Sequence, residues 1–152
     1  MSMTIKEMNA KAVAELTDVI NRIDPLQVDA LIEILVKANR IAFYGVGREG
    51  LMMKALAMRL FHVGLDAHVV GDMTPPPVGN GDFLVISAGP GYLSTEEALM
   101  GVPRSAGATT ICFTAQPGGR IPQSADLAVV LPAQTMADDT AKPSSFLPMG
   151  SL

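Results

Sequence analysis

The sequence has few of the residues that stabilise small secreted proteins or bind nucleic acids. Its single cysteine, Cys112, provides no disulfide framework and lies in a strand-like run over 109–114, where we expect a buried, inert thiol. The 11 basic residues are outnumbered by 15 acidic ones and form no cluster, so the net charge of -4 predicts no nucleic-acid partner. No apolar run has membrane-spanning length, and charged residues interrupt the N-terminal apolar pattern, unlike a signal peptide. We therefore expect a cytoplasmic protein with no membrane partner.

The length and the hydrophobic pattern predict one domain over residues 1–152. With 49% hydrophobic and 17% charged residues, the 152-residue chain can build a substantial core. Apolar residues at helical spacing predict two amphipathic helices within 4–39, separated at Asp24 and Pro25. They precede an α/β core over 40–152, and we expect them either to cover the edge of its sheet or to pack against another subunit.

Strand and helix patterns alternate through the core. Short apolar runs bounded by turn residues predict strands over 41–47, 67–70, 83–86, 109–114 and 126–131. A helix is predicted over 51–63, and others follow the third and fourth strands. This alternation is typical of a three-layer, doubly wound, parallel five-stranded sheet of flavodoxin-like order 2-1-3-4-5. In that order the first and third strands meet at the switch point where ligands bind.

The loop after the third strand resembles a binding loop for an anion. Ser87, Gly89 and Gly91 have little bulk, so backbone amides can approach a bound phosphate closely. The spacing of Ser94 and Glu97 predicts a capping box, which would use amides at the start of the next helix and leave those of 88–92 for the anion. The alternative is a structural turn that needs glycine only for its backbone angles.

The loop after the first strand reads Gly45-Val46-Gly47-Arg48-Glu49-Gly50, which fits the dinucleotide-binding pattern G-x-G-x-x-G. Asp72 stands where that pattern expects an acidic residue, but the bulky side chains of Arg48 and Glu49 would crowd a pyrophosphate. We interpret Arg48 as a cation aimed at the crevice. A surface ion pair with Glu49 or Asp72 is the alternative.

His62 is one of two histidines and belongs to the last turn of the helix after Gly50. It is either a packed, hydrogen-bonded side chain or a catalytic acid or base. Twelve helical residues separate it from Gly50, roughly 18 Å at the usual rise. If His62 is catalytic, it should therefore act in the site of a neighbouring subunit.

Five segments, taken in order, resemble the 6-phospho-3-hexuloisomerases of the SIS (sugar isomerase) domain group. They are Gly45-Val46-Gly47-Arg48, Ala57 to Gly64, Thr74-Pro75-Pro76, Ser87-Ala88-Gly89-Pro90-Gly91 and Pro148-Met149-Gly150-Ser151. The resemblance implies a homotetramer with active sites at subunit interfaces that converts 3-hexulose 6-phosphate to fructose 6-phosphate in the ribulose monophosphate route of formaldehyde fixation. It implies no cofactor and no metal.

The resemblance also suggests roles for residues. His62 and Arg48 become candidate catalytic residues, the first as acid or base and the second as a cation near the sugar oxygens. The candidate residues for binding the substrate and its phosphate are Gly47, Arg48, Ser87, Ala88, Gly89, Gly91, Tyr92, Ser94 and Ser151.

The sequence departs from the family in three places. Residues 88–93 replace the Ser-Gly-Ser-Gly-Glu-Thr of many members, and Glu49 replaces a serine, so fewer hydroxyl groups can contact a phosphate. The final helix of the family, which carries a glutamate thought to act as acid or base, is absent after Leu152. We therefore expect a shortened chain that could bind the sugar phosphate without turning it over. The alternatives are an arabinose 5-phosphate type of isomerase and a non-catalytic module that senses a sugar phosphate.

Overall fold

Five parallel strands form the centre of the structure, a computed structural model that describes residues 3–138 and 145–147. The strands are β1 (Ile41–Gly45), β2 (Ala67–Val69), β3 (Phe83–Ser87), β4 (Thr109–Thr114) and β5 (Leu127–Val130). Their order is β2-β1-β3-β4-β5, and every neighbouring pair is parallel. The predicted doubly wound sheet of order 2-1-3-4-5 is confirmed, and each predicted strand is present with bounds shifted by no more than a few residues.

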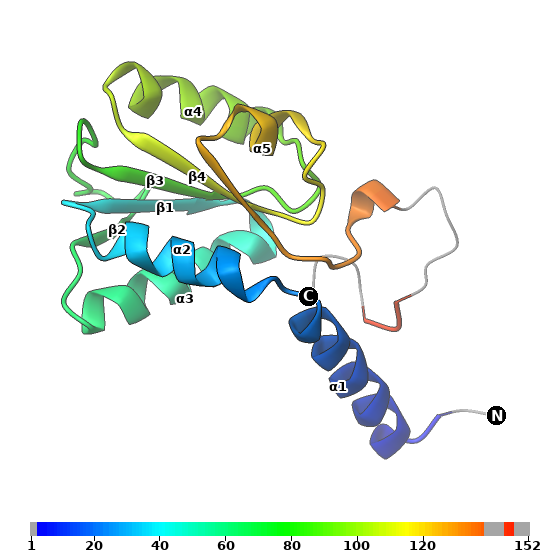
Figure 1. Ribbon diagram of the computed structural model, residues 1–152. Coiled ribbons are helices and arrows are strands. Elements are labelled where there is room, and N and C mark those ends of the chain that lie inside the picture. Colours follow the sequence, from blue (N-terminus) through cyan, green and yellow to red (C-terminus); the bar gives the residue numbers. More distant parts are fainter. Residues whose placement is uncertain (1–2, 139–144, 148–152) are drawn as a thin grey trace.

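Helices cover both faces of this sheet (Figure 1). On one face lie α2 (Pro25–Leu35) and α3 (Gly47–His62), and on the other lie α4 (Ser94–Ser105) and the short α5 (Arg120–Ser124). Alternate side chains of each strand enter different cores, as the period of two requires. In β1, Phe43 belongs to the core under α2 and α3, whereas Ala42 belongs to the core under α4 and α5.

The N-terminal helices have different roles. The side-chain amide of Gln27 in α2 donates to Val130 O (2.7 Å) and accepts from Val130 N–H (2.9 Å), so it pairs with the open side of the edge strand β5. This confirms that part of the N-terminal region covers the sheet edge. By contrast α1 (Ile5–Asn21), which begins with a capping box between Thr4 and Glu7, extends away from the sheet and has no buried residue (Figure 1).

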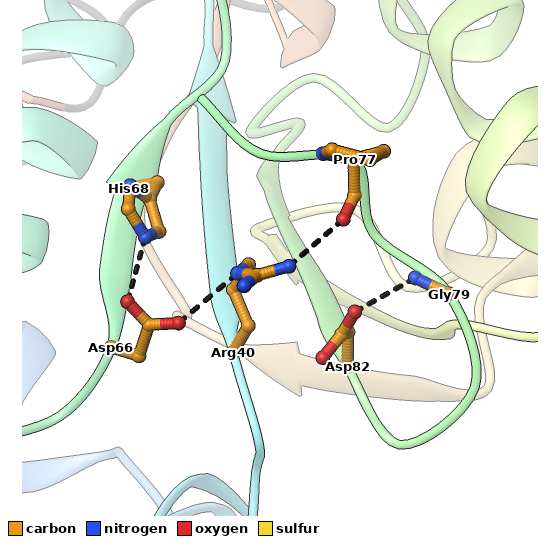
Figure 2. A network of polar contacts seen from close by, with 6 residues as sticks. All are labelled: Arg40, Asp66, His68, Pro77, Gly79 and Asp82. Carbon is orange, nitrogen blue, oxygen red and sulfur yellow. Dashed lines mark hydrogen bonds and ion pairs between the residues drawn. The ribbon is translucent and has the colours of Figure 1, made fainter. Parts of the chain in front are cut away.

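A polar network connects the segments that enter the sheet at its amino edge (Figure 2). Asp66 accepts hydrogen bonds from Arg40 Nε (3.0 Å) and contacts His68 Nε2 (2.7 Å), and Arg40 also donates to Pro77 O (3.0 Å). Nearby, the Asp82 carboxylate accepts from Gly79 N–H (2.8 Å). Since these residues precede β1, β2 and β3 or lie within β2, the network fixes the strand entries at the edge opposite the predicted ligand crevice.

Within the described part of the chain, no helix combines the length and apolar character needed to cross a bilayer. Cys112 is fully buried in β4, as predicted, and burial raises the pKa of its thiol to about 12. Such a thiol is protonated at neutral pH and is a poor nucleophile.

Candidate functional site

The carboxyl ends of β1 and β3 lie side by side, because Gly45 at the end of β1 pairs with Ser87 at the end of β3. The loops that follow them, together with Thr135 and Met136, line a cavity of about 280 Å³. Its lining residues are Val46, Gly47, Arg48, Glu49, Pro90, Leu93, Thr135 and Met136. The two loops predicted to flank a ligand crevice are thus together at the switch point of the sheet.

The glycines of the β1–α3 loop have a packing role. A Cβ at Gly50 would overlap the carbonyl oxygen of Gly45, so these two residues allow β1 and α3 to approach closely. Gly47 has φ +58° and begins α3, four residues before the predicted start. These contacts explain the glycine spacing without a dinucleotide. No side chain of the described residues caps α3 at Val46, so its first turn can attract an anion.

Several amides of the β3–α4 loop are bonded to the chain itself. Ala88 is fully buried, and its N–H donates to Phe113 O (2.8 Å), which continues the pairing of β3 with β4. The N–H of Gly91 donates to Ala88 O (2.9 Å). Pro90 has no N–H. The predicted row of open amides over 88–92 is therefore largely absent, because the loop uses these groups to hold its own shape.

The remaining donors at the end of β3 bind a carboxylate. Ser87 Oγ donates to Glu49 Oε2 at 2.6 Å, and Gly89 N–H donates to the same oxygen at 2.8 Å. These distances are typical of charge-assisted hydrogen bonds. A Cβ at Gly89 would lie 2.7 Å from Glu49 Oε1, so the missing side chain of Gly89 makes room for the carboxylate. We call Ser87 Oγ and Gly89 N–H the anion cradle.

The predicted capping box at Ser94 is wrong. Leu93 is the N-cap of α4, Ser94 is the first helical residue, and no side-chain cap is present in the described residues. Glu97 turns away from the helix start to form an ion pair with Arg120 of α5. A contact from another element thus outweighed the local pattern. The first turn of α4 is consequently open at the crevice, where its amides favour negative charge.

Glu96 is the functional candidate that the sequence reasoning missed. It is fully buried, and within the described residues neither of its carboxylate oxygens has a hydrogen-bond partner. Burial, and secondarily the charge of Glu49, raises the pKa of Glu96 to about 8, although the nearby Val46 amide partly opposes this. Glu96 is therefore protonated at neutral pH. Its spacing from the buried Met100 and Pro103 was a signal that it belongs to the inner face of α4.

The other candidate residues are distributed as follows. Arg48 lies in the cavity wall, and Tyr92 places its ring under the Arg120 guanidinium, 4.9 Å from Cζ to the ring centroid. His62 is exposed at the last position of α3, with its ring beside Phe61, and is therefore distant from the crevice of its own chain. Ser151 lies outside the described residues. No cluster of three or more potential metal ligands occurs in the ranges that the structure describes.

Comparison with known proteins identifies relatives of this fold and site. The SIS domain model matches residues 34–150. A 3-hexulose-6-phosphate isomerase of Mycobacterium gastri is 36% identical over 124 residues, which cover 82% of this chain and 62% of that protein. A 3-hexulose-6-phosphate isomerase of Bacillus subtilis is 31% identical over 150 residues, covering 99% of this chain and 81% of that protein. This chain thus spans less than two thirds of the first relative.

A solved structure is similar to this chain in both fold and sequence. A protein from Methanococcus jannaschii, for which a 3-hexulose-6-phosphate isomerase function was inferred, superposes with a TM-score of 0.70 and 29% identity, over 83% of this chain and 66% of that one. The name is a synonym of 6-phospho-3-hexuloisomerase. The match over 34–150 and the identity to the Bacillus subtilis protein show that the chain belongs to the SIS domain family, within the group of the 3-hexulose-6-phosphate isomerases.

Proposed function

We propose that this chain binds a phosphorylated hexulose in the crevice between the β1–α3 and β3–α4 loops and interconverts 3-hexulose 6-phosphate and fructose 6-phosphate. The observation that supports this most directly is the anion cradle, where Ser87 and Gly89 already hold a carboxylate oxygen at 2.6 and 2.8 Å. A phosphate oxygen is also a negatively charged acceptor and could accept the same two hydrogen bonds. The open first turns of α3 and α4 add positive potential, and the relatives named above are isomerases of this sugar phosphate.

The reaction needs a proton to move between neighbouring carbons. A base removes the proton from C2 of the 3-hexulose, an enediolate forms, and C3 is protonated while O3 gains and O2 loses a proton. Arg48, in the cavity wall, would stabilise the developing oxyanion. Ser87, Gly89 and Ser94 would hold the phosphate, so that the reacting carbons stay near the charged groups.

His62 is our candidate for the acid or base, supplied by a neighbouring subunit. It is exposed on α3 beside apolar side chains that no part of the described chain covers. The exposed large apolar residues of α1, α2 and α3 include Ile5, Val13, Ile20, Leu26, Ile32, Leu51, Met52, Met58 and Phe61. Assembly would bury this surface and bring His62 to another crevice. We propose a homotetramer that works in the cytoplasm, in the ribulose monophosphate route of formaldehyde fixation.

The test is an isomerisation assay in deuterated water, with 3-hexulose 6-phosphate generated in the reaction. We would compare the 152-residue chain with a version that carries the family's C-terminal helix, and arabinose 5-phosphate would serve as the alternative substrate. Formation of fructose 6-phosphate with deuterium on carbon supports the proposal. Binding of fructose 6-phosphate by both versions without any exchange of carbon-bound hydrogen would instead identify a sensor of the sugar phosphate.

A further inference from the structure

The side chain of Glu49 occupies the place where an anionic ligand would bind. One oxygen, Oε2, accepts both hydrogen bonds of the anion cradle, and Oε1 lies in the space beside Gly89 that a side chain would otherwise fill. Glu49 belongs to α3, whereas the cradle belongs to the end of β3, 38 residues further along the chain. The contact therefore links the two loops of the crevice through a carboxylate of the chain itself.

The β3–α4 loop offers a ligand few substitutes for this cradle. The amides of Ala88 and Gly91 are bonded to Phe113 O and Ala88 O, and Pro90 has no amide hydrogen. A ligand that uses the donors at the end of β3 must therefore take the position that Glu49 Oε2 now holds. A second anion beside the Glu49 carboxylate would also be repelled, because like charges held close together near a protein surface are only partly screened by solvent.

Glu96 is a second carboxyl group that interacts electrostatically with Glu49. It is fully buried in the first turn of α4, and neither of its oxygens has a hydrogen-bond partner in the described residues. Burial, together with the Glu49 charge, keeps Glu96 protonated. A buried, protonated carboxyl group offers no positive charge that would favour a second anion beside Glu49.

We propose that Glu49 is an internal competitor for the anion cradle: its carboxylate binds Ser87 Oγ and Gly89 N–H in the free protein and leaves when the phosphate of a ligand binds. Glu49 also lines the cavity of about 280 Å³, which gives its side chain space to move into. The residue thereby sets how tightly the site holds a phosphate. The phosphorylated sugar as the natural ligand rests on the function proposed above, whereas the competition itself does not.

The test compares the binding of inorganic phosphate by calorimetry to the wild type, Glu49→Gln, Glu49→Ser and the control Glu97→Gln. Glu97→Gln also removes one carboxylate near the crevice, in the first turn of α4. The Glu97 side chain pairs with Arg120 and does not contact the anion cradle, so this variant controls for the loss of charge alone. We expect Glu49→Gln and Glu49→Ser to bind phosphate about tenfold more tightly or better, and Glu97→Gln to change affinity by less than about twofold. Unchanged or weaker binding in both Glu49 variants would overturn the proposal, as would the absence of binding in every protein.

A measurement on the wild type keeps the test independent of how the variants fold. Titration with phosphate should shift the amide resonance of Gly89, since its hydrogen bond passes from Glu49 to the ligand, and leave that of Gly118 in place. A Gly89 resonance that stays fixed at saturation would overturn the proposal. If the protein turns over substrate but shows neither the affinity change nor the Gly89 shift, only the competition by Glu49 is refuted. If it shows both effects but no turnover, only the proposed isomerase function is refuted.

Discussion

Gly91 and Gly119 lie backbone to backbone. A Cβ added to Gly119 would overlap the Cα and the carbonyl oxygen of Gly91, and one added to Gly91 would lie 3.0 Å from Gly119 Cα. Gly91 also has φ +81°, and its carbonyl accepts a hydrogen bond from Ile121 N–H at 3.1 Å. The loop after β3 is therefore held in place by the start of α5, on the next unit of the fold. Because Gly91 follows Gly89 closely in this loop, we expect the contact to help position the anion cradle.

Replacing Gly119 with alanine should destabilise the protein and disturb the cradle. Because the nearest atoms are backbone, the loops must separate to admit a methyl group, which costs about 1–3 kcal/mol. Urea denaturation would measure the loss of stability, and phosphate titration the loss of affinity. Gly118→Ala is the matched control, since nothing lies within 4 Å of its added Cβ. Equal stability of the two variants would show that the loops are not in close contact.

The stability of the protein should depend on pH through Glu96. Its pKa is about 8 in the folded protein and 4.5 for the unperturbed group, so between these values the folded state holds a proton that the unfolded chain has released. Raising the pH through this window therefore lowers the free energy of unfolding, by at most about 1.4 kcal/mol per pH unit. Glu96→Gln removes this contribution, so its stability relative to the wild type should increase from about pH 5 to about pH 8.

The informative quantity is how the difference in free energy of unfolding between Glu96→Gln and the wild type changes with pH. Its absolute value is less informative, because a buried glutamine destabilises the protein by an amount that does not vary with pH. Glu97→Gln, which alters an exposed carboxylate of the same turn, should follow the wild-type curve. If denaturation curves of Glu96→Gln and the wild type run parallel across this range, Glu96 is not protonated in the folded protein.

Asp66 should make the free energy of unfolding depend on pH in a more acidic range than Glu96 does. Its hydrogen bond with His68, and its contact with Arg40, lower the pKa of its carboxyl below 3.8 (Figure 2). The contribution to stability is therefore present above that value and is lost as the pH falls through the lowered pKa. Since the side chain is 47% exposed, we expect Asp66→Asn to cost no more than about 1 kcal/mol near neutral pH.

Denaturation near neutral pH and near pH 3 would measure this, and the difference between Asp66→Asn and the wild type should shrink in acid. Asp18→Asn is a suitable comparison, because Asp18 of α1 forms an exposed ion pair with Arg22, the C-cap of the same helix, rather than with a residue near another strand. A difference for Asp66→Asn that persists in acid would mean that the carboxylate charge does not stabilise the network.

Mixing two inactive variants should test whether His62 acts in a neighbouring site. His62 and Arg48 lie at opposite ends of the 16-residue α3, so one chain does not bring them together. We expect His62→Ala and Arg48→Ala each to lose turnover, and co-assembled subunits to recover about a quarter of the wild-type rate through sites that hold both intact residues. Mixtures with no more activity than their components would place both residues in one subunit's site or remove His62 from catalysis.

The sheet could be predicted because each strand is a short apolar run bounded by turn residues, and because alternation with helices allows few topologies. The start of α4 could not be predicted. Leu93 is its N-cap, and Glu97 forms an ion pair with Arg120, which is distant in sequence, instead of capping the helix. Likewise, the loops of Glu49 and Ser87 were predicted to lie together, but not that the glutamate would fill the cradle. That contact depends on the rotamer of one side chain and on the space beside Gly89, which no local pattern records.

The exposed apolar side chains of α1 have a consequence for how the protein responds to dilution. The helix has 17 residues, buries none of them, and exposes apolar side chains such as Ile5 and Ile20. A lone helix of about 15 residues is only marginally stable in water. Within its own chain, Glu15 of α1 accepts hydrogen bonds from Ser145 Oγ (2.8 Å) and Leu147 N–H (3.0 Å), and in the homotetramer proposed above a neighbouring subunit would cover the apolar side chains. In the homotetramer proposed above, helix formation and assembly would be linked by mass action. On dilution, hydrogen exchange should accelerate in α1 first, while the amides of β1 and β3 remain protected.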